Sequence, residues 1–460
     1  MKTLRVARML ALPGALLLPR VSAAQTVAQG PEAPPARVAS QTVSFVETLQ
    51  RAREEVPSVL TAIARARAAE AQIDTARAAY YPTLTLSSSP RMSFSDSPFL
   101  PATATTQALR LQNFALAADV TAQARMTLYD FGRTAANVSA AERGRRASDE
   151  DIRTAALTAM TQAAQQYITV LNDREAVTNA RAVVAQREAQ LQIAEGLVRN
   201  GARPPIERIR AEVNLDAARL DLVSTEAREE TDRATLAAAI GLDPVVTVDV
   251  APLPEDAFAV DDDPARAAQL ALAARPEFAA ARARLEQAQA QRDASQAQRR
   301  PTLAATAQAG ASYTEVVTGR GLGGLSENAS AGLSLSWPVF DATARANIQV
   351  AERNVATAQA TLDAQSLQVR AAAVQAALAT RSSRAALAQA ERLATLAAAN
   401  LEQAEGRYRN GAGTLLEMVD AQAADQSARV SVVRARLSFA LARLQLVSAV
   451  GGLERMASPR

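Results

Sequence analysis

Two hydrophobic periods alternate along this chain of 460 residues. Apolar residues at roughly helical spacing predict helices over 42–79, 134–199, 205–240, 265–298, 342–405 and 415–450. Between these helices, alternation of period two predicts strands that begin at 83 and cover 116–128, 302–313 and 329–339. The intervals 88–113 and 314–328 are rich in Ser, Pro or Gly, and we expect long loops there. The order of helix, strand pair, long helix and returning helix occurs twice.

An internal repeat accounts for this order. The segment Gly406–Ala412 has an earlier copy at Gly196–Ala202, 210 positions before it, and the same offset pairs Ala136–Val138 with Ala346–Ile348. A register shared over about 100 residues indicates a duplication. We therefore predict a first repeat at 42–242, a crossover linker with one short strand at 243–264, a second repeat at 265–452 and a C-terminal tail at 453–460.

Each predicted strand has one apolar and one polar face. In the segment 116–128, Asp119, Thr121, Gln123 and Arg125 alternate with apolar residues, and its length suffices to cross a bilayer when tilted. An edge strand of a soluble sheet would alternate in the same way. Four such segments with aromatic residues at their ends favour a membrane β-barrel, and we assign membrane-interface positions to Tyr129, Phe131, Trp337 and Phe340. Because four strands cannot close a barrel, several chains must share one.

Two of the predicted helices are unusually long. The segments 134–199 and 342–405 contain no Pro and almost no Gly, so each would reach roughly 100 Å at 1.5 Å per residue. Each ends at an Asn-Gly turn, after which the chain runs back as a shorter helix. This pattern predicts two helical hairpins with coiled-coil character.

The N-terminus predicts export. Lys2, Arg5 and Arg8 precede the apolar segment Met9–Leu18, and small residues follow, which is typical of a signal peptide at 1–24. Residues 25–41 then form a Pro- and Ala-rich flexible lead. The rest of the chain contains no run of about eighteen apolar residues. Without the basic residues Lys2, Arg5, Arg8 and Arg20, the formal charge of +3 becomes −1, which does not favour nucleic-acid binding.

The composition excludes most kinds of catalytic site. The chain contains no Cys and no His, so disulfides, thiolate nucleophiles, His bases and metal sites with Cys or His ligands are excluded. A periplasmic hydrolase would need Asp261–Asp263 for acid–base or metal chemistry, but these acids lie in a linker beside Pro264 without a partner of another type. We therefore expect no catalytic residue, no cofactor and no bound metal, and a protein that is not an enzyme.

The motifs Tyr129–Arg133 and Trp337–Asp341, each after a predicted membrane strand, and the two Asn-Gly turns resemble those of the TolC-type outer-membrane efflux proteins of Gram-negative bacteria. The resemblance covers about 41–453. It implies an α+β membrane protein: a homotrimer whose chains contribute four strands each to a 12-stranded barrel, continued by an α-helical coiled-coil tunnel in the periplasm. It also implies contact with outer-membrane lipid, a periplasmic adaptor (membrane fusion) protein and an inner-membrane pump. Such a protein is the exit duct of tripartite efflux or type I secretion.

The resemblance also implies roles at the turns. Glu417 and Asp420 match two acidic positions that form rings at a closable aperture, and their separation of three residues places them on one helix face. Glu207 and Tyr408 match contacts that close this aperture. Gly413 stands where the family often has a basic residue, and Arg203, Arg208 and Arg409 are candidate replacements. Acids near a helix N-terminus are also favoured by the helix dipole alone.

The two turns are the predicted docking surface for the adaptor. Their residues are Arg199, Asn200, Gly201, Arg203, Pro204, Arg409, Asn410, Gly411 and Gly413. Asn-Gly is also ordinary turn chemistry, and exposed arginines on Ala-rich helices commonly serve solubility.

One other class of function shares the helical hairpins. A periplasmic coiled-coil adaptor or scaffold would have them, but it should lack four amphipathic strands with aromatic ends. The sequence does not specify the cargo, and drugs, metals, small organic molecules and polypeptides all fit a polar duct.

Overall fold

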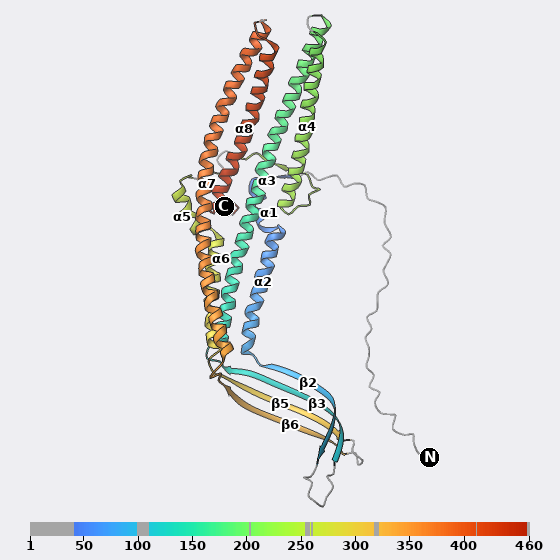
Figure 1. Ribbon diagram of the computed structural model, residues 1–460, viewed down its shortest axis with the longest axis vertical. Coiled ribbons are helices and arrows are strands. Elements are labelled where there is room, and N and C mark those ends of the chain that lie inside the picture. The colour runs from blue at the N-terminus through green and yellow to red at the C-terminus, as the bar shows by residue number, and fades with distance from the viewer. Residues whose placement is uncertain are drawn as a thin grey trace, which may run out of the picture. The chain divides into compact units, whose positions relative to one another are not determined.

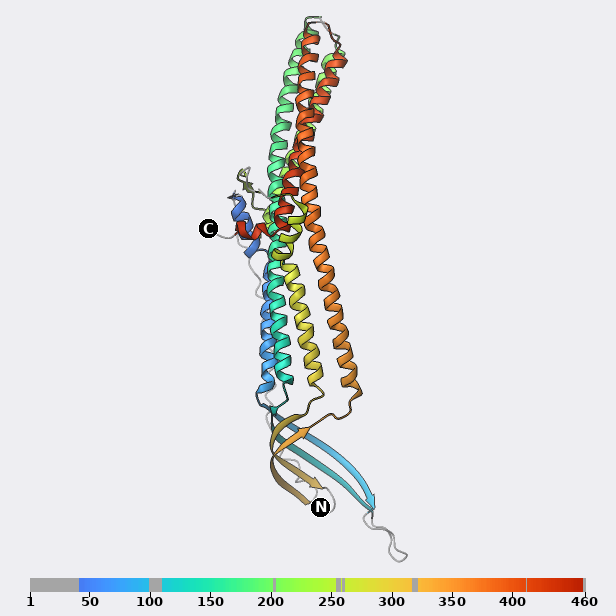
Figure 2. The same ribbon diagram turned by 90° about the vertical axis from the view of Figure 1, so that its left-hand side faces the viewer.

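A computed structural model of the chain describes residues 41–98, 110–201, 204–253, 258, 261–316, 322–410 and 412–457 (Figure 1). The predicted signal peptide at 1–24 and nearly all of the lead at 25–41 lie outside this part. The described residues belong to one compact unit, Ser40–Arg460. Within it, a four-stranded sheet lies at one end of the helices and two helical turns lie at the other (Figures 1 and 2).

Two long helices connect the sheet with the helical turns. Helix α3 covers Arg133–Arg199 and α7 covers Ala342–Arg409, with 67 and 68 residues. At 1.5 Å per residue each is about 100 Å long. Helix α4 (Ile206–Ala239) packs antiparallel on α3, and α8 (Leu415–Ala449) packs in the same way on α7. Both predicted helical hairpins are therefore present.

Shorter helices cover the half of α3 and α7 nearer the sheet (Figure 2). Helix α2 (Pro57–Arg77) packs on α3, while α6 (Pro276–Ala297) packs on both α3 and α7. Ion pairs join these helices as well, as between Arg284 of α6 and Asp151 of α3, where N and O lie 2.6 Å apart. Helix α6 thus joins the two long helices.

The predicted single helices at 42–79 and 265–298 are each broken by a proline. The first becomes α1 (Phe45–Glu54) and α2, followed by one 3₁₀ turn, η1 (Ala78–Tyr80), and the second becomes α5 (Pro264–Ala274) and α6. Pro57 and Pro276 each stand at the first position of a new helix, preceded by an extended residue. Proline has no N–H to donate to the preceding turn, so it begins a helix more readily than it continues one.

The sheet consists of β2 (Thr83–Pro98), β3 (Arg110–Tyr129), β5 (Thr302–Val316) and β6 (Leu322–Ser336) in the order β2-β3-β5-β6. All neighbours are antiparallel. The strands extend well into the intervals predicted as loops, because pairing within a hairpin satisfies backbone groups whatever the side-chain pattern. Pro90 and Pro98 are tolerated since β2 is an edge strand. The pair β3–β5 joins the two predicted halves.

A compact core lies beside the middle of α3. The strand β1 (Gln41–Val43) pairs in parallel with β4 (Val248–Val250) from the crossover linker. Around this pair, Tyr167 of α3 is fully buried and donates a hydrogen bond from its hydroxyl to the carbonyl oxygen of Ala251, at 2.6 Å. Burial raises the pKa of this hydroxyl to about 12. The core therefore ties the linker to the first helical hairpin.

The end of the chain differs from the expected tail. Residues Gly452–Ala457 form helix α9, which packs on α1, and Leu453 is fully buried in the same core. The preceding Gly451 has a φ of +71°, which lets the chain turn sharply out of α8. The first residues after 452 are thus part of the packed structure.

Candidate functional site

The first candidate site is the sheet itself, because one of its faces is mainly apolar and the other is mainly polar. Residues that pair directly across neighbouring strands lie on the same face of the sheet. One row of such partners across the four strands consists of Leu84, Ala124, Ala307 and Ala331. The next row, on the opposite face, consists of Thr83, Arg125, Thr306 and Gly332. The alternation seen in each strand therefore gives one mainly apolar face, on which Glu315 and Glu327 also lie, and one mainly polar face.

The apolar face is open to its surroundings. On the outer strands β2 and β6, the large apolar side chains of this face are between 66 and 78% exposed, namely Leu84, Leu86, Met92, Phe94, Leu325, Leu333 and Leu335. On the inner strands β3 and β5 they are between 37 and 48% exposed, namely Leu116, Val120, Met126 and Tyr313. A soluble monomer rarely leaves so large an apolar surface uncovered. The outer strands β2 and β6, with 16 and 15 residues, each pair on one side only within the described part of the chain. Such long open edges normally require a partner.

All four predicted interface aromatics lie where the sheet meets the helices. Tyr129 ends β3 and packs edge-on against Phe131, with ring centroids 4.6 Å apart. Trp337 and Phe340 follow β6 and are 63 and 74% exposed. Their role at the membrane interface stays a prediction.

The same junction contains matched helix caps. The carboxylate of Asp130 accepts hydrogen bonds from the backbone N–H groups of Gly132 and Thr134, at 3.1 and 2.7 Å. Asp341 accepts from those of Thr343 and Ala344, at 2.8 and 3.1 Å. These aspartates explain why the motifs Tyr129–Arg133 and Trp337–Asp341 each contain an acid: each one caps the start of the long helix that follows a strand.

The second candidate site is the pair of turns at the far end of the helices (Figure 1). In the first turn, Arg199 ends α3, and the N–H of Asn200 donates to the carbonyl oxygen of Gly196 at 3.1 Å. Gly201 has a φ of +69°, which an L side chain rarely adopts. The carbonyl oxygen of Pro204 then accepts from the N–H of Glu207 at 3.1 Å, in the first turn of α4. Arg203 lies outside the described residues.

In the second turn, the N–H of Asn410 donates to the carbonyl oxygen of Gly406 at 3.1 Å. Gly411 and the side chains of Tyr408 and Arg409 lie outside the described part, so the predicted contact between Glu207 and Tyr408 stays a prediction. The same holds for Arg203 and Arg409 as replacements of the basic residue absent at Gly413. The third candidate, Arg208, pairs with Glu212 on its own helix, at 2.6 Å.

The two predicted ring carboxylates stand at the start of α8. The hydroxyl of Thr414 accepts a hydrogen bond from the N–H of Glu417 at 3.3 Å and caps the helix. Asp420 follows one turn later, and both side chains are exposed. Arg407, which is not among the three predicted basic replacements, also lies here, because its Nη2 is 3.7 Å from Oε2 of Glu417. The sequence gives little indication of this ion pair, because Arg407 and Glu417 are ten positions apart and belong to different helices.

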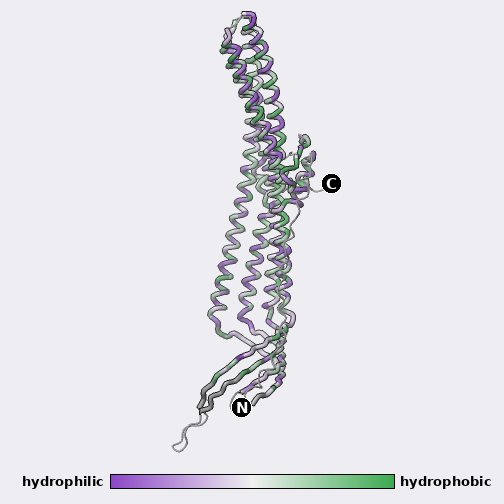
Figure 3. The backbone as a smooth tube through the Cα atoms, turned by 90° about the vertical axis from the view of Figure 1, so that its right-hand side faces the viewer, coloured by the Kyte–Doolittle hydropathy of each residue, from purple (hydrophilic) through white to green (hydrophobic). Residues whose placement is uncertain are grey.

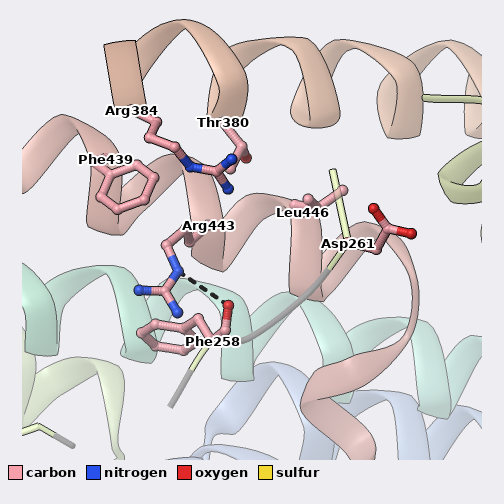
Figure 4. A pocket seen from close by; sticks show the side chains of 7 residues that line it. All are labelled: Phe258, Asp261, Thr380, Arg384, Phe439, Arg443 and Leu446. Atoms are coloured by element: carbon pink, nitrogen blue, oxygen red, sulfur yellow. Dashed lines mark hydrogen bonds between the residues drawn. The ribbon is translucent and has the colours of Figure 1, made fainter. Parts of the chain in front are cut away.

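A third place is a cavity of about 380 Å³ between α7, α8 and the crossover linker (Figure 4). Arg384 and Arg443 reach into it from the two helices, next to the ring of Phe439. Arg443 donates to the carbonyl oxygen of Phe258 at 3.0 Å, and Arg384 pairs with Asp262 at 2.9 Å. Both arginines therefore contact the linker, which gives them a structural role.

Among the described residues, no helix is both long and apolar enough to cross a membrane. Hydrophilic and hydrophobic positions are interspersed along the helices (Figure 3).

Comparison with known proteins decides the family. The model of the outer membrane efflux protein family matches residues 48–242 and 267–452, which together make up most of the chain. The chain belongs to the outer membrane efflux protein family. This outer membrane efflux protein is 29% identical over 436 residues to protein CyaE of Bordetella pertussis, a match that covers 90% of this chain and 85% of CyaE.

Solved structures of outer-membrane proteins share its fold. The outer membrane protein VceC of Vibrio cholerae superposes with a TM-score of 0.69 at 20% identity, covering 89% of this chain and 96% of VceC. The open-state outer membrane channel MtrE of Neisseria gonorrhoeae gives a TM-score of 0.65 at 21% identity, covering 90 and 91%. The resemblance found in the sequence is thereby confirmed. This efflux protein is an outer-membrane export channel of a Gram-negative bacterium, and the adaptor or scaffold alternative is set aside.

Proposed function

We propose that three copies of this chain close one 12-stranded barrel in the outer membrane, each copy contributing β2, β3, β5 and β6. The observation that supports this assembly most is the open sheet with an exposed apolar face and two long unpaired edges. In a closed barrel, the β2 edge of one copy would pair with the β6 edge of the next and complete the backbone hydrogen bonds. The apolar face would then contact lipid, and the polar face would line the channel.

The helices would continue the channel into the periplasm. The turns of the hairpins α3–α4 and α7–α8 lie at the end of the helices away from the sheet, and α3 and α7 are long enough to extend far from the membrane. We interpret residues 42–242 and 265–452 as two copies of one unit. Their matching order of elements and the two segments matched by the family support this interpretation.

The helical turns would form the periplasmic mouth of this tunnel. Its predicted partners are a periplasmic adaptor, which would dock on the two turns, and an inner-membrane pump. In a trimer, Glu417 and Asp420 would each form a ring of three carboxylates, which favours cations. Their shared helix face and exposure support this role.

The assembly is tested by membrane fractionation and electrophoresis. We expect the protein in the outer membrane as a trimer that dissociates on heating, and a pore when it is reconstituted in planar bilayers. Recovery as a soluble periplasmic monomer would contradict the proposal. For the mouth, the double change Glu417→Ala and Asp420→Ala should lower cation selectivity of the pore. Unchanged selectivity would remove the ring assignment and leave the assembly intact.

A further inference from the structure

The second helical turn contains a contact network centred on one arginine. Arg407 lies in the last turn of α7, and its carbonyl oxygen accepts hydrogen bonds from the N–H groups of Ala412 and Gly413, at 2.9 and 3.1 Å. Its guanidinium donates to the carbonyl oxygen of Ala412 at 3.5 Å. The same guanidinium nitrogen lies 3.7 Å from the carboxylate of Glu417. One residue therefore contacts the turn and the first turn of α8.

The first helical turn does not repeat this arrangement. At the offset of 210 positions, Glu207 corresponds to Glu417, whereas Leu197 corresponds to Arg407. The side chain of Leu197 can neither donate a hydrogen bond nor balance a charge. The position that corresponds to Asp420 is Arg210, so the two turns also differ in the sign of this charge. The contact that the Arg407 side chain makes therefore has no counterpart at the matching position of the first turn, which is Leu197.

The two carboxylates at the start of α8, those of Glu417 and Asp420, differ in their charged neighbours. Glu417 has a guanidinium close to it, whereas no ion pair of Asp420 is found among the residues that the structure describes. The side chains of Arg407 and Glu417 are 61 and 49% exposed, so water screens their attraction. The hydrogen bonds around the turn keep the start of the arginine side chain beside α8. The positive charge therefore stays near Glu417 although the pair is exposed.

We propose that Arg407 is both the latch of the second turn and the counter-charge of Glu417, so that Asp420 dominates the charge that a cation meets there. This inference rests on the proposed role of the turns as the mouth of the channel. It assigns a positioning and charge-setting residue to this mouth and replaces Arg203, Arg208 and Arg409 as the basic partner in the second turn. The ligand class is a hydrated multivalent cation.

The test measures block of the reconstituted trimer by hexaamminecobalt(III) in planar bilayers. Asp420→Asn should raise the Kd of block more than Glu417→Gln does. Arg407→Gln should lower this Kd about two- to fivefold, because it leaves Glu417 uncompensated. In the double variant with Arg407→Gln and Glu417→Gln, this gain should disappear. Arg407→Lys, which keeps the charge, should remain within about twofold of the wild type.

Arg199→Gln is the matched control, because it removes one positive charge per chain from the first turn, and the ion pair found for Glu417 in the described part of the chain is with Arg407. Its effect on block should be the same whether residue 417 is Glu or Gln. All variants are first checked for the heat-dissociable trimer. The inference is overturned if Arg407→Gln has no effect, or the same effect with Glu and with Gln at 417. If neither Asp420→Asn nor Glu417→Gln changes block, the proposed mouth itself is wrong.

Discussion

Asp173 of α3 offers the sharpest test of the packing between α3 and α4. Its side chain is only 3% exposed, and its carboxylate lies 3.4 Å from Nε of Arg228 on α4. That arginine also lies 3.7 Å from the carboxylate of Asp232. Burial is the main cause that raises the pKa of the Asp173 carboxyl, a hydrogen bond with Asp232 acts in the same direction, and Arg228 acts in the opposite direction. Together they give a pKa of about 7. The fold therefore favours the neutral carboxyl.

The size of the expected effect on the free energy of unfolding follows from this pKa. A rise from 3.8 to about 7 corresponds to roughly 4 kcal/mol of preference for the neutral form. Because the pKa is higher in the folded than in the unfolded chain, this stabilisation is complete below about pH 4 and is lost as the pH rises through 7. The side chain of Arg228 is 62% exposed, so it can move toward the carboxylate of Asp173 when this ionises and offset part of the cost of the buried charge. We therefore expect about half of the value, roughly 2 kcal/mol, to appear in the free energy of unfolding.

Asp173→Asn keeps the shape of the side chain and is neutral at every pH. It should raise the free energy of unfolding by about 2 kcal/mol near pH 8 and change it little near pH 4. For a chain of this size, that gain raises the thermal midpoint by on the order of 2 °C. Far-UV circular dichroism of the detergent-solubilised protein, recorded across this pH range, measures the shift.

Asp221→Asn is the control, because Asp221 is exposed on α4, the helix that carries Arg228. It should leave the midpoint unchanged at both pH values. If Asp173→Asn shifts the midpoint equally at both pH values, or lowers stability near pH 8, then Arg228 holds the buried carboxylate ionised and the reasoning is wrong.

Two further predictions concern the sheet and the helix ends. Ala329→Arg, on the apolar face in the middle of β6, should cost up to about 2–4 kcal/mol in the membrane and reduce the yield of outer-membrane trimer. Its neighbour Ser330→Arg, on the polar face, should assemble normally, and equal yields in electrophoresis would contradict the assignment of the faces. Gly241→Ala should destabilise the protein by about 1–2 kcal/mol, because Gly241 has a φ of +80° and a Cβ would lie 3.1 Å from the carbonyl oxygen of Glu55. Gly196→Ala, inside α3 with nothing within 4 Å of the added Cβ, should instead stabilise it by about 0.5–1 kcal/mol, and denaturation midpoints that shift in the same direction would refute this distinction.

The sequence by itself determined the elements whose period persists over many residues. The long helices α3 and α7 followed from segments without Pro, and the faces of β3 followed from strict alternation. These features depend on neighbours along the chain, and so do the turns at Asn200 and Asn410. The family could be predicted for the same reason, because its motifs stand at fixed places between such elements.

Tertiary structure alone decided the contacts between distant segments. The pairing of β1 with β4, the docking of α9 on α1 and the pairing of β3 with β5 each join residues far apart in the sequence. The contact of Arg407 with Glu417 and the burial of Asp173 also depend on how one helix packs against the next. A local pattern specifies which face of an element is apolar. Which partner covers that face depends on the packing of the whole chain, and so does the charge of a side chain held there.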